Sequence, residues 1–177
     1  MGTVKEPQSV VLFASIIFQA DDDLRKTLDD LTSLVGAITE QTPVEQFIQT
    51  TYYAKEMGIN LLRTFVLFGP LVKRGTLSGI KLKTNAIEKS FACDGKRAVN
   101  IDPGYIALEH VILATTKGYA HRVYLDNGIH ADLTLMYRNG AYRPLEWTYP
   151  DYAEAQTISL FHRWREQLKK VLKCQKA

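Results

Sequence analysis

Val10-Val11-Leu12-Phe13-Ala14-Ser15-Ile16-Ile17-Phe18 is the stretch that decides the fold. Its apolar residues occupy both odd and even positions, whereas a strand with one face in water alternates between apolar and polar residues. We therefore expect a central β-strand in a sheet that is covered on both faces. The stretch is well short of the ~20 residues that a membrane-spanning helix needs, so we expect no membrane partner.

A helix is expected directly after this strand. Asp21-Asp22-Asp23 offers an N-cap and an acidic first turn, and Gly36 ends the helix. The buried positions recur at helical spacing and are Leu24, Leu28, Leu31 and Leu34. The turn before this helix holds three acids and no glycine, so it cannot cradle a phosphate as a P-loop does.

The middle of the chain predicts further strands and a second helix. Strands are expected near residues 37–40, 45–49 and 61–68, the last of them ending before Gly69-Pro70. A helix over residues 76–91 would bury Leu77, Ile80, Ile87 and Phe91. A second stripe beside it would lie half-buried on a rim and consists of Lys81, Thr84, Asn85 and Glu88.

The second half of the chain predicts mainly strands. Residues 97–101 form a short strand, Asp102-Pro103-Gly104 has the composition of a turn, and residues 106–113 fit either helix or strand. Asn127-Gly128 and Asn139-Gly140 each suit a type I′ turn, so residues 119–143 form a three-strand meander. A last helix over residues 154–173 would bury Ile158, Phe161, Trp164, Leu168, Val171 and Leu172, and would expose Arg163, Arg165, Lys169, Lys170 and Lys173.

These elements predict an α+β fold. We expect a single mixed, largely antiparallel sheet with a central first strand and about three to four helices packed on it. A C-terminal three-strand meander and a last helix complete it. Residues 1–177 would form a single domain, because a chain of this length with 46% hydrophobic residues can build one substantial core.

The turn at Asn127-Gly128 also predicts a strand register. A two-residue turn pairs Val123 with Asp132 and His121 with Thr134, so His121 and Asp132 share a face and lie diagonally to one another. A carboxylate in that position can orient the imidazole and raise its basicity. His121 and Asp132 are therefore the candidate catalytic pair, and a solvated surface contact is the alternative.

Charge and cysteine usage narrow the classes of partner. Twenty-two basic and nineteen acidic residues give a net charge of +3, which is less than a dense phosphate-binding stripe would supply. Nucleic acid is thus a partner that we do not favour.

The cysteines and the N-terminus indicate the compartment. Cys93 and Cys174 form no metal-type pair, and the N-terminus lacks a signal-peptide pattern, so we expect free thiols and a cytoplasmic location.

Several motifs together resemble a bacterial family, the domain of unknown function 4416. They are Tyr52-Tyr53-Ala54-Lys55-Glu56-Met57-Gly58, Lys81-Leu82-Lys83-Thr84-Asn85, Asp94-Gly95-Lys96-Arg97, Val99-Asn100-Ile101-Asp102-Pro103-Gly104-Tyr105, Ala114-Thr115-Thr116-Lys117, His121-Arg122-Val123-Tyr124-Leu125 and Trp147-Thr148-Tyr149-Pro150-Asp151-Tyr152. The resemblance covers nearly the whole chain and implies a bacterial origin. It implies no activity.

The polar residues within these motifs suit a small anionic ligand. Lysine, arginine and amide groups clamp a phosphate or a carboxylate, and a His–carboxylate pair can move protons. The candidate ligand-binding residues are Lys81, Asn85, Glu88, Arg97, Asn100, Asp102, Lys117 and Arg122. Each of them taken alone also fits an ordinary ion pair or turn residue.

Metal binding is not predicted, because His121 lies several strand pairs from His130, too far for two ligands of one ion. No serine or cysteine lies in a sequence context that is typical of a catalytic nucleophile.

Three classes of function stay open: an enzyme or binding protein for a small anion, a nucleic-acid-associated module, and a protein-interaction domain without catalysis. The sequence names neither a cofactor nor an oligomeric state.

Overall fold

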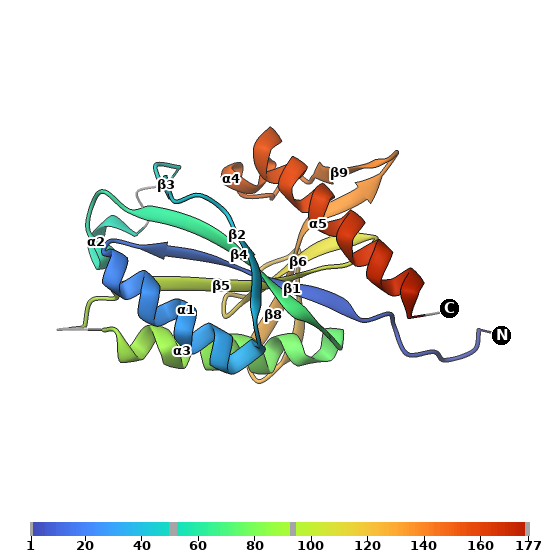
Figure 1. Ribbon diagram of the computed structural model, residues 1–177, viewed down its shortest axis with the longest axis horizontal. Helices are drawn as coiled ribbons and strands as arrows, with labels where there is room; N and C mark the ends of the chain where they lie inside the picture. The colour runs from blue at the N-terminus through green and yellow to red at the C-terminus, as the bar shows by residue number, and fades with distance from the viewer. Residues whose placement is uncertain (1, 50–52, 93–94, 176–177) are drawn as a thin grey trace.

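The computed structural model describes residues 2–49, 53–92 and 95–175, and its strands form one nine-stranded sheet (Figure 1). Across the sheet the strands are β2 (Ile38–Gln41), β4 (Leu62–Val72), β1 (Val10–Phe18), β5 (Val99–Ile106), β6 (His110–Thr115), β8 (Ile129–Arg138) and β7 (Arg122–Asp126). In addition, β3 (Glu45–Gln46) pairs with β4, and β9 (Ala141–Pro144) pairs with β8. The helices are α1 (Asp21–Val35), α2 (Ala54–Met57), the 3₁₀ helix η1 (Arg74–Thr76), α3 (Leu77–Ser90), α4 (Pro150–Ala153) and α5 (Ala155–Cys174). The predicted α+β fold with a largely antiparallel sheet is confirmed.

Strand β1 lies inside the sheet, between β4 and β5, and all of its residues are buried. Its side chains alternate between the two faces of the sheet. Leu12, Ile16 and Phe18 pack with α1 and α3 on one face, while Val11 and Phe13 pack with α5 on the other. Figure 1 shows this layering, with α1 and α3 below the sheet and α5 above it. The unbroken apolar run predicted this position correctly.

Helix α1 begins and ends close to where the sequence predicts. Gly36 follows its last residue with a φ of 118°, a backbone conformation that glycine adopts without strain. The predicted aspartate N-cap is wrong, because Ala20 occupies the cap position and the three aspartates fill the first turn. Their negative charges there still interact favourably with the positive end of the helix dipole.

Helix α3 packs on the core with its predicted apolar stripe and also buries polar residues beside that stripe. Lys81, Thr84 and Glu88 are buried, whereas Ile80 and Ile87 are only partly buried. These three polar residues, which we expected on a half-exposed rim, therefore face inward, while Asn85 is half-buried as predicted. The reason is a set of bonds from Lys81 and Glu88 to the main chain of β5, which a single helix pattern does not reveal.

Two proline–glycine segments lie within strands and not in turns. Strand β4 continues through Gly69 and Pro70 to Val72, with an irregular register against β1 at this point. The predicted turn at residues 102–104 is also wrong, because these residues belong to β5 and pair with Ser15, Ala14 and Phe13 of β1. A proline is tolerated in a strand when its missing N–H faces no hydrogen-bonded partner. The segment that the sequence left open, residues 106–113, contains the turn between β5 and β6 and most of β6.

Both predicted hairpins are confirmed, with positive φ at Asn127, Gly128, Asn139 and Gly140, as type I′ turns require. The register before the first turn differs from the prediction. The pairing between β7 and β8 is irregular between Tyr124 and Asp126, so Asp132 pairs with Arg122 in place of Val123. An extra residue in one strand moves every side chain beyond it to the opposite face.

Helix α5 packs on the sheet through Phe161, Trp164, Leu168 and Leu172, as expected. Two of its residues differ from the prediction, because Arg165 is buried and Val171 is exposed. The Nε of Arg165 donates to the carbonyl oxygen of Leu108, and the guanidinium lies 3.4 Å from the ring centroid of Tyr137. Among the described residues, no helix is both long enough and apolar enough to cross a membrane.

Candidate functional site

A cleft of about 740 Å³ opens where the sheet divides between β5 and β6. These strands pair only next to the turn that joins them, from Ile106 with Val111 to Gly104 with Leu113. Beyond that point β5 stays with β1, and β6 stays with β8. The cleft is lined by residues of both diverging strands, and it has the volume of a typical small-molecule site.

Pro103 and Gly104 lie at the point of divergence. The N–H and C=O of Ile101 both point away from β1, since they bond to side chains of α3, and residues two apart on a strand point the same way. The nitrogen of Pro103 thus faces β6 and has no hydrogen to donate. Gly104 allows the close approach before the split, because a Cβ there would lie 2.5 Å from the carbonyl oxygen of Ile112.

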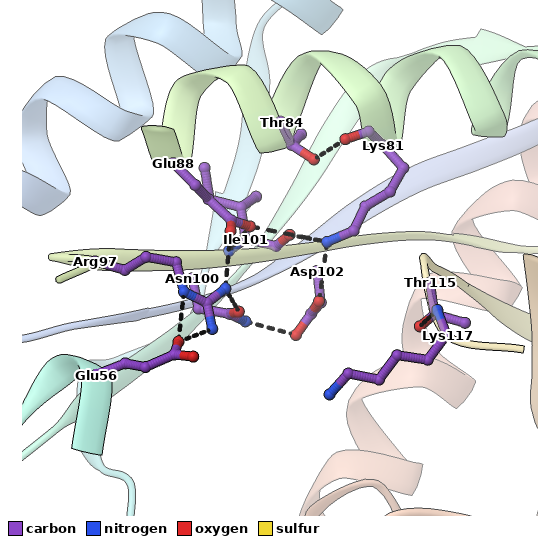
Figure 2. Close-up of polar contacts among 10 residues, drawn as sticks. All are labelled: Glu56, Lys81, Thr84, Glu88, Arg97, Asn100, Ile101, Asp102, Thr115 and Lys117. Atoms are coloured by element: carbon purple, nitrogen blue, oxygen red, sulfur yellow. Dashed lines mark hydrogen bonds and ion pairs between the residues drawn. The ribbon is translucent and has the colours of Figure 1, made fainter. Parts of the chain in front are cut away.

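Lys81 and Glu88 take the place of a neighbouring strand along the divided edge of β5. The Nζ of Lys81 donates to the carbonyl oxygen of Ile101 at 2.8 Å, and the N–H of Ile101 donates to Oε1 of Glu88 at 2.8 Å (Figure 2). The lysine nitrogen also lies 3.2 Å from Oδ1 of Asp102 and 3.8 Å from Oε1 of Glu88. Buried main-chain groups need such partners, so these two predicted ligand-binding residues also hold the fold.

Arg97 connects α2, α3 and β5. Its guanidinium donates to Oε2 of Glu56, to Oε2 of Glu88 at 3.0 Å and to Oδ1 of Asn100 at 3.0 Å. Burial raises the pKa of the Glu88 carboxyl, and the nearby Lys81 ammonium opposes that rise only in part. The guanidinium therefore directs its donors to acceptors of the protein itself.

Asn100 and Asp102 form the polar surface of the β5 wall. The side-chain amide of Asn100 donates to Oδ2 of Asp102 at 2.7 Å, and the Asp102 side chain keeps 32% of its surface exposed. Each carboxylate oxygen of Asp102 thus accepts a bond from the protein and keeps a lone pair for a further donor. Asn85, the other predicted residue of α3, lines the same cleft and is half-buried.

The β6 wall carries Thr115, Thr116 and Lys117. The N–H of Lys117 donates to Oγ1 of Thr115 at 3.1 Å, which fixes the loop after β6. Figure 2 shows the Lys117 side chain extending from this loop toward Asp102. The residue is exposed, so its ammonium group can meet a ligand that enters the cleft.

Arg122, Asp132 and Tyr149 close the far end. Nε of Arg122 donates to Oδ2 of Asp132 at 2.9 Å, and its Nη2 donates to the Tyr149 hydroxyl at 2.7 Å. Asp132 is buried and also accepts a bond from Thr134. Burial raises the pKa of the Tyr149 phenol, which keeps its proton at neutral pH. Because of the register shift in β7, it is Arg122 that occupies the cleft side of Asp132.

His121 lies behind this wall and does not line the cleft. Its Nε2 is 3.4 Å from Oδ2 of Asp132, so the predicted proximity of the two residues is present. The imidazole stacks on Trp147 with centroids 4.9 Å apart and makes an edge contact with Tyr119. Its predicted role in proton transfer stays a prediction, and any influence on a ligand would pass through Asp132.

The remaining predicted residues converge on the one cleft. Its lining includes the ligand-binding candidates Lys81, Asn85, Glu88, Arg97, Asn100, Asp102, Lys117 and Arg122, together with Asp132. The sequence did not identify Phe47, Tyr53 or Asp151 as lining residues. Asp151 forms a buried ion pair with Arg63 of β4. The motif at residues 147–152 was a signal for Tyr149 and Asp151, whereas nothing near Phe47 distinguishes it from a core residue.

No group of three or more His, Cys, Asp or Glu side chains within residues 2–49, 53–92 and 95–175 is arranged to hold a metal ion. Cys174 is a free, exposed thiol, and Cys93 lies outside the described residues. The lining of the cleft includes lysines and arginines, which carry positive charge. The arrangement can bind an anion and offer hydrogen-bond acceptors on the opposite wall.

Comparison with known proteins gives one match. The model of a family described as Domain of unknown function (DUF4416) matches residues 8–168, which is most of the chain. No curated protein matches the chain, and no solved structure matches it.

Proposed function

The chain belongs to the DUF4416 family, whose description names no activity, and we propose that it binds a small metabolite carrying a phosphate or carboxylate group. The binding site is the cleft between β5 and β6. The observation that carries this proposal is the position of Lys117, an exposed residue that lines a cleft of about 740 Å³ and whose side chain extends toward Asp102 (Figure 2). We take the bacterial cytoplasm expected from the sequence as its setting.

The anionic group would rest on the β6 wall. Lys117 supplies a charge there, and the Thr115 hydroxyl can donate a further hydrogen bond. Arg122 adds positive potential from behind, although Asp132 balances part of its charge at 2.9 Å. Glu88 and Asp102 face Lys81 and Arg97 on the other wall, so those cations are already balanced. The free end of the ligand would therefore point toward β5.

Lys117→Ala tests the proposal. A charge-assisted hydrogen bond contributes about 1.5–3 kcal/mol, so we expect the affinity for the best-bound probe to fall by roughly tenfold or more. The probes are inorganic phosphate, citrate, phosphoenolpyruvate and ribose 5-phosphate, measured by thermal shift and titration calorimetry. Stability should change by less than about 1 kcal/mol, because the residue is exposed.

Lys170→Ala on the exposed side of α5 is the matched control, and we expect it to bind as the wild type does. The proposal is overturned if none of the four probes binds. It is overturned equally if a probe binds and both lysine variants retain its affinity, because the anion would then lie elsewhere.

The nucleic-acid alternative has less support. On α5, Arg163 pairs with Glu40, Lys169 lies 3.6 Å from Glu166, and Arg165 is buried. These contacts reduce the continuous positive surface that a phosphate backbone would need.

The protein-interaction alternative rests on strand β7. Val123 and Tyr124 are 69% and 59% exposed, on a strand that pairs only with β8. Exposed apolar edges of this kind can pair with another chain. Val123→Lys would abolish such an association and leave the binding of a small anion unchanged, which separates this function from the one that we propose.

A further inference from the structure

The two walls of the cleft differ in chemistry, and this difference limits the ligand. The β6 wall presents Lys117 and Thr115, while the β5 wall presents Asn100 and Asp102. Asp102 can only accept hydrogen bonds when it is ionised. A ligand made of nothing but an anionic group would satisfy the first wall and be repelled by the second.

Asp102 keeps acceptor lone pairs that the protein does not use. Its Oδ1 accepts from Lys81 at 3.2 Å and its Oδ2 from Asn100 at 2.7 Å, which fixes the carboxylate in one orientation. With 32% of the side chain exposed, lone pairs of this fixed carboxylate face the cleft. A neighbouring amide and carboxylate of this kind suit ligand hydroxyl groups, which donate to the carboxylate and accept from the amide.

The ring surfaces of the cleft fit the same kind of ligand. Tyr53 and Tyr149 both line it, and burial raises the pKa of both phenols, so each hydroxyl keeps its proton. A neutral phenol offers an apolar face for carbon–hydrogen groups and a polar end for a hydroxyl. Aromatic and polar groups thus both line the space between the two walls.

We propose that the ligand is a polyhydroxylated phosphate ester, that is, a sugar phosphate or polyol phosphate. Its phosphate contacts Lys117 and Thr115, and its hydroxyl groups donate to Asp102 beside Asn100. This inference rests on the proposed function, because it assumes that the cleft binds an anion. It adds that hydroxyl groups supply a distinct part of the binding free energy.

A matched pair of probes tests the hydroxyl contribution on the unaltered protein. Glycerol 3-phosphate and propyl phosphate have the same chain length and the same phosphate, and only the first carries hydroxyl groups. We expect calorimetry to give a roughly tenfold or greater advantage for glycerol 3-phosphate, since two satisfied hydrogen bonds contribute about this much. Ribose 5-phosphate should bind at least as tightly, and inorganic phosphate should resemble propyl phosphate.

Variants assign the effect to the two walls. Asp102→Asn should remove the advantage of glycerol 3-phosphate while leaving the affinity for propyl phosphate within about twofold or raising it, because the repulsion is removed. Lys117→Ala should weaken both probes alike. Asp126→Asn, at the exposed last residue of β7, is the control and should change neither affinity.

The outcomes separate the two proposals. Equal affinities for glycerol 3-phosphate and propyl phosphate, both lowered in Lys117→Ala, would overturn the polyhydroxylated ligand and leave the anion site standing. An advantage that persists in a folded Asp102→Asn variant would also overturn the inference. If neither probe nor inorganic phosphate nor ribose 5-phosphate binds, this inference fails together with the proposed function.

Discussion

Gly104 shows how a single hydrogen in place of a side chain shapes this protein. A Cβ at this position would lie 2.5 Å from the carbonyl oxygen of Ile112 and 2.7 Å from Cζ of Phe13. These neighbours belong to β6 and β1, so neither can withdraw without disturbing the sheet. We expect Gly104→Ala to lower the free energy of unfolding by about 1–3 kcal/mol, the usual cost of overpacking, in urea denaturation.

Gly79 provides the control for that measurement. It lies inside α3 with nothing within 4 Å of an added Cβ. Gly79→Ala should therefore raise the free energy of unfolding by about 1 kcal/mol, because alanine favours the helix. If Gly104→Ala is as stable as the wild type, the close approach of β5 to β6 at the split does not constrain this position.

At the scale of elements, α3 and β5 are joined by charged side chains as well as by apolar ones. Glu88 accepts from the main chain of Ile101 and from Arg97, while Lys81 bonds the other side of the same residue. Such bonds fix the rotation of α3 about its axis. They also hold Asp102 and Arg97 in place, so the helix positions the β5 wall of the cleft.

The raised pKa of Glu88 makes this junction sensitive to pH. Its ordinary value is 4.5, and burial raises the pKa in the folded protein, so the unfolded chain loses this proton more easily. The stabilisation from this group is thus full below pH 4.5 and is lost as the pH rises through the folded value. We expect the wild type to lose stability relative to Glu88→Gln as the pH rises from 4.5 to 7.5, in urea denaturation at each pH.

Glu146→Gln, at an exposed position, is the control for the same titration. Its difference in stability from the wild type should stay nearly constant over this range. A wild type that gains stability relative to Glu88→Gln as the pH rises would show that the ion pairs with Lys81 and Arg97 outweigh burial.

For the molecule as a whole, stability should be graded from the centre of the sheet to its edge. Strand β1 has a neighbour on each side and a covered core on each face, whereas β7 pairs only with β8 and is largely exposed. We expect the amides of β1 to exchange with solvent deuterium only through global unfolding, and those of β7 through smaller local openings. Native-state hydrogen exchange measures both, and equal protection of β1 and β7 would contradict this gradient.

The sequence by itself determined the features whose signals are local. They are the apolar run of β1, the leucine spacing of α1, the two Asn-Gly turns and the apolar face of α5, and each lies within one continuous segment of at most 20 residues. Periodicity and turn chemistry act over that range, so these elements were predicted correctly. The list of polar residues that line the cleft was also largely predictable, since they occur in the motifs shared with the family.

Only the tertiary structure decided how those elements form a site. The same Pro103 and Gly104 that indicate a turn instead divide the sheet, because β1 holds β5 while β6 follows β8. The inward position of Lys81 and Glu88 on α3 depends on Ile101, a residue thirteen positions beyond Glu88. An irregularity in β7 brings Arg122 to Asp132 and leaves His121 behind the wall. Each of these outcomes depends on contacts between segments that are distant in the chain. Local sequence patterns do not predict such contacts.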